Sequence, residues 1–136
     1  MSMHSILYVS ARLIAAIILL QTLYFKFTAS PESVYIFTVV GMEPWGRIAV
    51  GVLELVAGLL LVISATAWLG GLLSLGLMGG ALMMHMTKLG ISVQGDGGYL
   101  FFLALAVALC SLYVVIINKD QILTVVKRAR TFAWRG

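Results

Sequence analysis

Residues 48–63 read IAVGVLELVAGLLLVI, a run of apolar residues and glycine that is interrupted once, by Glu54. Its length approaches the roughly 20 residues with which a helix spans the hydrocarbon core of a bilayer. A charged side chain in that core costs roughly 3 kcal/mol on insertion scales, so it usually faces the interior of a helical bundle and pairs with another group. The stretch therefore predicts a membrane-spanning helix with one inward-facing acid.

Three further apolar stretches of similar length lie on either side of this one. The four expected spans are at about residues 6–25, 47–65, 67–88 and 99–118. Hydrophobic residues make up 62% of the 136 residues and charged residues only 10%, a composition too apolar for a soluble domain. Because backbone groups in lipid must be satisfied internally, we predict an all-α integral membrane protein, a single domain over residues 1–136 folded as an antiparallel four-transmembrane-helix bundle.

A short helix is expected between the first two spans, at about residues 31–40. Ser30 can cap its start and Pro31 suits the first helical position. Gly41 supplies a stop, and Pro44 prevents the helix from continuing. Ten apolar-rich residues are too few to cross a bilayer, so this helix should lie at the interface or over the bundle.

Positive charge is concentrated in the tail, residues 119–136, which holds five of the nine Lys and Arg residues. By the positive-inside rule this predicts a cytoplasmic C-terminus and, with four spans, a cytoplasmic N-terminus. The tail could also rest on anionic headgroups, each basic residue contributing about 1 kcal/mol. This clustering beside the last span points to a membrane surface and not to nucleic acid as the partner.

Four polar residues on three of the spans fall in the same half of the membrane. Lys26 marks the outer end of the first span, and Gln21 lies about 7 Å below it at helical rise. By the same measure Glu54 lies about 12 Å below the outer end of its span, and His85 about 4–5 Å. Intramembrane ionisable groups usually pair, so these residues predict a small polar pocket reached from the outer leaflet.

Such a pocket suits a lipid-soluble molecule with polar oxygens, such as a quinone. His85 and Lys26 could hydrogen-bond a carbonyl, and Glu54 or His85 could exchange protons. Alternatively, Glu54 pairs with a base only to fix the register of the helices. Arg12 enters from the cytoplasmic side and could either approach Glu54 from below or extend to the inner headgroups.

Several chemistries are excluded or disfavoured by the residues available. Cys110 is the only cysteine, so the chain by itself cannot run dithiol exchange. Met83, Met84 and Met86 flank His85 and are soft ligands, but successive helical residues point in different directions, so no metal site is predicted. The sequence contains no nucleotide-binding loop, zinc-protease motif or serine-hydrolase motif.

The third span is rich in small residues. Gly76 and Gly80 form a G-x-x-x-G pair, and Gly70 with Ser74 continues the same face. Such a face lets two helices approach closely, so we expect packing within the bundle, with a homo-oligomer formed through Gly76 and Gly80 as the alternative. The loop at residues 92–98 is polar and glycine-rich, which fits a lid or a simple turn.

The order of these features resembles the DoxX-like family of small four-helix membrane proteins. The first span ends in YFKF at residues 24–27, and the short helix leads to GMEPW at 41–45. The second span reads GVLELVAGLLL at residues 51–61, and the small-residue-rich third span closes on His85. The resemblance extends over about residues 7–117.

This resemblance implies a four-helix bundle in the bacterial inner membrane and a role as the membrane partner of a soluble or membrane redox enzyme. Lys26, Glu54 and His85 occupy the polar positions of the family, whereas Gln21 is added from depth alone. Because relatives also include assembly factors, the alternative is a non-enzymatic scaffold that binds other membrane proteins.

Overall fold

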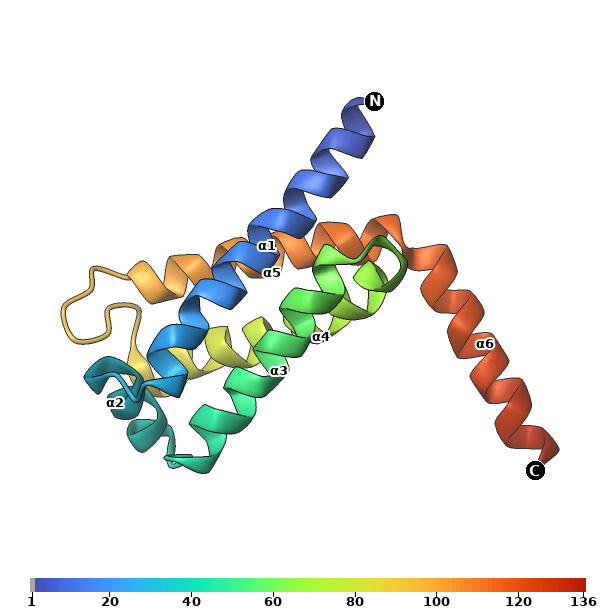
Figure 1. The fold of residues 1–136 in the computed structure, drawn as a ribbon. Coiled ribbons are helices and arrows are strands. Elements are labelled where there is room, and N and C mark those ends of the chain that lie inside the picture. The colour runs from blue at the N-terminus through green and yellow to red at the C-terminus, as the bar shows by residue number, and fades with distance from the viewer. Residues whose placement is uncertain (1) are drawn as a thin grey trace.

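The computed structural model describes residues 2–136, and all of its regular structure is helical (Figure 1). The elements in chain order are α1 (Met3–Phe27), α2 (Pro31–Val40), α3 (Trp45–Val62), η1 (Ser64–Thr66), α4 (Ala67–Met84), η2 (His85–Leu89), α5 (Tyr99–Ile117) and α6 (Lys119–Arg135). Four segments are long and apolar enough to cross a membrane: α1, α3, α4 with its flanking turns, and α5. The predicted four-span bundle with a short helix between spans 1 and 2 is confirmed.

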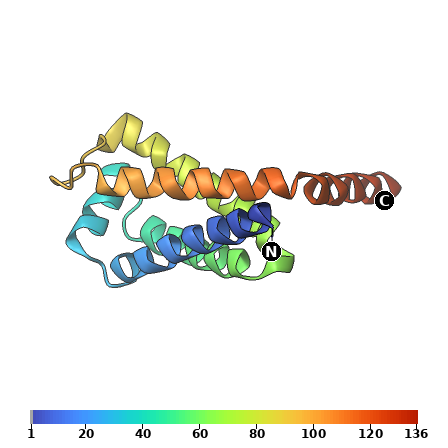
Figure 2. The ribbon, with the colours of Figure 1, turned by 90° about the horizontal axis from the view of Figure 1, so that it is seen from above.

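The four long helices form a closed ring. Helices α1 and α4 each pack against both α3 and α5. Helix α2 and the loop between η2 and α5 lie together at one end of this bundle, and α6 projects from the other end (Figures 1 and 2). The two ends therefore carry different parts of the chain, and they also differ in packing.

Helix α2 has the bounds that its capping residues predict. The Ser30 hydroxyl accepts a hydrogen bond from the Ser33 amide at 3.3 Å, and Pro31 stands at the first helical position. Gly41 ends the helix in the left-handed region, with φ of 82°. The second span ends earlier than expected, at Val62, because Ile63 is extended and a 3₁₀ turn follows it.

The helices approach each other closely at the end of the bundle near α6. A Cβ atom on Gly70 would lie 2.7 Å from the Leu61 nitrogen, so α4 and α3 meet backbone to backbone there. The hydroxyls of Ser74 and Ser111 lie 2.5 Å apart and join α4 to α5. The expected packing through small residues thus occurs at Gly70 and Ser74.

The G-x-x-x-G pair behaves differently. A Cβ atom on Gly76 or Gly80 would meet nothing within 4 Å, so the expectation that this pair packs within the bundle is wrong. Both glycines instead line an open cavity between the helices. A homo-oligomer through Gly76 and Gly80 stays a prediction.

Arg12 is buried and binds the end of α3, and it does not pair with Glu54. Its guanidinium donates to the carbonyls of Leu61 and Val62 at 2.9 and 2.7 Å and to the Ser64 hydroxyl at 3.0 Å. The last carbonyls of a helix have no partner within the helix, and Arg12 supplies donors for those of α3. It thereby ties α1 to the turn between α3 and α4.

Candidate functional site

A cavity of about 470 Å³ lies at the end of the bundle that carries α2. Its wall comes from α1, α2, α3, α4 and α5 and is mostly apolar, with Leu19, Ile36, Met78, Leu103 and Val107 among the lining residues. Gly76 and Gly80 also line it, and their lack of side chains leaves the space open. The volume falls in the range of about 300–1,000 Å³ that is typical of small-molecule sites.

The four residues selected from the sequence, Gln21, Lys26, Glu54 and His85, all line this one cavity. They come from α1, α3 and the first residue of η2. Gln21 is the most open of them, since it is exposed and makes no hydrogen bond within the described chain. That these four residues bind a ligand stays a prediction, but they lie around the same cavity, as a shared binding site requires.

An ion pair crosses the cavity wall from α1 to α3. The Lys26 Nζ atom lies 2.9 Å from Glu54 Oε2, with 16% of the lysine side chain and 5% of the glutamate side chain exposed. The Thr22 hydroxyl donates to the Leu19 carbonyl at 2.8 Å and lies 3.5 Å from the same carboxylate oxygen. Glu54 therefore faces the interior of the bundle and not the acyl chains.

His85 begins a π-helical turn at the end of α4. Its Nδ1 atom lies 2.8 Å from the carbonyl oxygen of Gly90, and its ring meets Phe101 edge to face with centroids 5.7 Å apart. A carbonyl oxygen can only accept, so Nδ1 carries the hydrogen and Nε2 of the neutral ring has a free lone pair. The backbone of the following loop thus selects the tautomer of His85.

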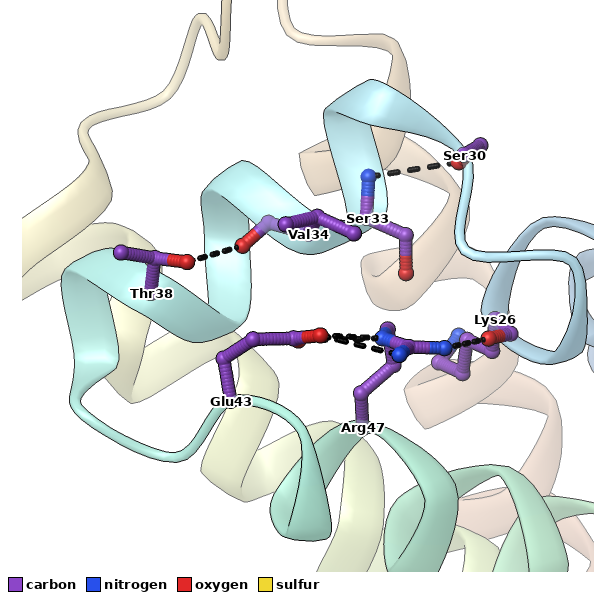
Figure 3. Close-up of polar contacts among 7 residues, drawn as sticks. All are labelled: Lys26, Ser30, Ser33, Val34, Thr38, Glu43 and Arg47. Carbon is purple, nitrogen blue, oxygen red and sulfur yellow. Dashed lines mark hydrogen bonds and ion pairs between the residues drawn. The ribbon is translucent and has the colours of Figure 1, made fainter.

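A second ion pair fixes the junction of α1, α2 and α3 beside the cavity (Figure 3). Arg47 Nε donates to both carboxylate oxygens of Glu43, at 2.9 and 3.0 Å, and an Nη atom of Arg47 donates to the backbone carbonyl of Lys26. Arg47 therefore holds the end of α1 from which the Lys26 side chain extends.

Sequence reasoning missed Thr22, Glu43 and Arg47. The last two are four residues apart, but Glu43 lies in the turn before α3, so the spacing rule for a helical face does not predict their ion pair. Thr22 lies four residues before Lys26 and so shares its face of α1. The contact from Arg47 to the Lys26 carbonyl has no local signal, because it joins residues 21 positions apart.

The loop that follows η2 has a defined shape. Asp96 accepts hydrogen bonds from the amides of Val93, Gly98 and Leu100 at 2.9, 2.8 and 3.2 Å. Burial raises the pKa of the Asp96 carboxyl, but these donors together outweigh it and leave the pKa below its ordinary value. Val93 is only 1% exposed and anchors the loop to the bundle. The loop is thus a fixed turn at the cavity end, held at Gly90 by His85.

Comparisons of the chain with protein-family models, curated proteins and solved structures found no match. The fold and the cavity therefore define the class of protein by themselves. It is a multi-pass membrane protein with four candidate spans, an apolar cavity at one end of the bundle and a buried ion pair in the cavity wall.

Proposed function

We propose that this protein binds a lipophilic ligand of the quinone type, or another amphiphile with a polar head, in the cavity beside Lys26, Glu54 and His85. The observation that carries the proposal is the composition of the wall. A mostly apolar surface suits a ring and its tail, while a small number of polar groups can orient the head. An ion pair that served only to hold helix register would not need an open cavity beside it.

The role of membrane partner to a redox enzyme rests on the resemblance to the DoxX-like family, whose motifs run from residues 24–27 to His85. The bilayer location rests on the four apolar spans. The cavity is lined in part by α2, which lies at the end of the bundle opposite the basic helix α6 (Figure 1). With α6 in the cytoplasm, as the positive-inside rule favours, the cavity opens in the outer half of the bacterial inner membrane.

One observation favours the alternative of a scaffold for other membrane proteins. Gly76, Gly79 and Gly80 leave a surface on α4 with no neighbouring atoms, and small residues are where membrane helices approach each other most closely. Because Gly76 and Gly80 line the cavity as well, a partner helix would enter the same opening as a small ligand.

The two functions differ in what co-purifies with the protein and in how glycine variants affect it. Gly80→Leu adds a side chain to the cavity wall, whereas Gly79→Leu adds the same side chain at an exposed position outside the lining. Both sites have open space around the new Cβ atom, so both variants should fold.

Lipid extracts of the purified proteins, analysed by mass spectrometry, test the proposal. We expect a quinone-type molecule with the native protein and with Gly79→Leu, and at least a tenfold smaller amount with Gly80→Leu. Equal recovery from both variants would place the ligand outside the cavity. Recovery of a membrane protein and no amphiphile, with release by either variant, would favour the scaffold.

A further inference from the structure

We infer that the cavity recognises its ligand as a hydrogen-bond donor, so that the hydroquinone form of a quinone-type ligand binds more tightly than the quinone form. This inference rests on the proposed function and specifies the chemistry of the ligand head. It comes from two acceptor atoms on the buried ionisable side chains of the wall, Glu54 and His85, each with a lone pair and no partner.

The first of these atoms is Oε1 of Glu54. Both contacts of the carboxylate, from Lys26 Nζ and from the Thr22 hydroxyl, are made to Oε2. Within residues 2–136 no fully covered side-chain oxygen or nitrogen lacks a hydrogen-bond partner. Since Oε1 has no hydrogen bond and Glu54 is buried in the cavity wall, this oxygen is open to the cavity.

The second atom is Nε2 of His85. The hydrogen bond to Gly90 places a hydrogen on Nδ1, so in the neutral ring Nε2 is an acceptor. It has no partner in the described chain. Because every fully covered side-chain nitrogen and oxygen of residues 2–136 has a hydrogen-bond partner, Nε2 must be partly accessible. In the neutral ring the one donor of His85 is already used by the loop backbone, so the expected hydrogen bond to a ligand carbonyl would come from Lys26.

Among the buried polar groups of the wall, these two acceptors discriminate between hydroxyl and carbonyl head groups, whereas the exposed amide of Gln21 can pair with either. A hydroxyl can donate to Glu54 or His85 and still accept from the ammonium of Lys26, whose contact with Glu54 uses one of its three hydrogens. A carbonyl can only accept, so it satisfies Lys26 and displaces water from the two acceptors without replacing it. One buried acceptor left without a donor corresponds to about a tenfold loss of affinity.

A set of three probes with the same decyl tail tests the inference on the full-length protein in phosphatidylcholine nanodiscs. They are a decyl hydroquinone, the corresponding benzoquinone, and the dimethyl ether of the hydroquinone, which has the same ring but no hydroxyl hydrogen. Titrations are run without oxygen, with binding measured by calorimetry. We expect the hydroquinone to bind at least tenfold more tightly than the other two.

Two histidine variants test the loss of the Nε2 acceptor separately from any loss of folding. In His85→Asn the side-chain amide keeps a donor for the Gly90 carbonyl and removes Nε2, whereas His4→Asn makes the same change at an exposed position near the start of α1. We expect His85→Asn to weaken hydroquinone binding about tenfold and to leave quinone binding unchanged. His4→Asn should bind all three probes as the native protein does.

The possible failures are distinguishable. Equal affinity for hydroquinone and quinone, or tighter binding of the quinone, overturns the inference while the proposed cavity stands. The same holds if His85→Asn weakens both forms equally. If none of the three probes binds the native protein, or if Gly80→Leu binds them as well as Gly79→Leu does, the proposed function itself is wrong.

Discussion

The carboxylate of Glu54 is kept inside an apolar bundle by the ammonium of Lys26, which approaches from the neighbouring helix. The two exposures are unequal, with 16% of the lysine side chain accessible and 5% of the glutamate side chain. Most of the desolvation cost therefore falls on the acid, and the lysine offsets it. Removing one partner of a buried pair is far more costly than removing both, because the remaining charge is left without compensation.

Lys26→Met should therefore destabilise the protein by about 3 kcal/mol, because it leaves Glu54 unpaired in the cavity wall. The double variant Lys26→Met with Glu54→Leu should recover most of that loss, since no buried charge remains. Unfolding in mixed detergent micelles with increasing sodium dodecyl sulfate measures both. A double variant that is as unstable as Lys26→Met would show that the unpaired charge of Glu54 is not the cause of the loss.

The second prediction at this scale concerns pH and the Asp96 turn. Its folded-state pKa is below the ordinary value of about 3.9, so the carboxylate stabilises the loop at pH values above that. This stabilisation should be lost as the pH falls from about 4 through the lower folded-state pKa.

Amide hydrogen exchange at Val93, Gly98 and Leu100 measures this effect, because these amides donate to the carboxylate. After correction for the intrinsic rate, their protection should decrease below about pH 4. In Asp96→Asn protection should be lower at pH 6 and independent of pH. The same pH dependence in the native protein and in Asp96→Asn would assign it to another group.

At the scale of elements, the spans and α2 could be predicted because their signals are local. About twenty apolar residues define a span, and Ser30, Pro31 and Gly41 define the ends of α2. The role of Arg12 could not be predicted, because its partners at the end of α3 lie about 50 residues away in sequence. The depth estimated from the helical rise per residue placed Glu54 and His85 in the same half of the bundle. It could not predict which of their atoms are already hydrogen-bonded.

The glycines of α4 show the same limit of sequence patterns and provide a third prediction. Gly70→Ala should destabilise the protein by about 1–3 kcal/mol, because its Cβ atom would lie 2.7 Å from the α3 backbone. Gly76→Ala should be neutral or stabilising by up to about 1 kcal/mol, because its Cβ atom has no neighbour and alanine favours the helix. Thermal unfolding in detergent compares them. A larger loss for Gly76→Ala would mean that another chain packs there.

Helix α6 has no buried residue and separates apolar from basic side chains, which is typical of a helix lying on a membrane surface. Its apolar face is formed by Ile122, Val125, Val126, Ala129, Phe132 and Ala133. Lys127, Arg128 and Arg135 lie on the other side, at helical spacing. The apolar face has no partner within the described chain, and we propose that lipid covers it.

The fourth prediction is that α6 is ordered by anionic lipid. In nanodiscs containing phosphatidylglycerol, its amides should exchange more slowly than in nanodiscs of phosphatidylcholine alone. Charge reversal by Lys127→Glu and Arg128→Glu should remove most of this difference, since each basic residue near such a surface contributes about 1 kcal/mol. Equal exchange in both lipid compositions would show that charge does not hold the helix.

For the whole molecule, the contrast between the two ends of the bundle matters most. Near α6 the helices are joined by Arg12, by Gly70 and by the Ser74–Ser111 contact. At the other end the cavity separates the helices, and the links around it include the ion pair at Glu54, the contact from Arg47 to the Lys26 carbonyl and the covering helix α2. This division depends on how the helices cross, so composition and periodicity could not predict it.

The fifth prediction concerns the orientation of these two ends in the membrane. The basic α6 should be cytoplasmic and the cavity end should face outward. In a Cys110→Ser background, which has no other cysteine, Ser92→Cys marks the cavity-end loop and Thr131→Cys marks α6. A membrane-impermeant maleimide added to intact spheroplasts should label Ser92→Cys only, and both variants should react after lysis. Labelling of Thr131→Cys alone in intact spheroplasts would reverse the orientation and move the cavity to the cytoplasmic half, where a ligand would have to enter from the inner leaflet.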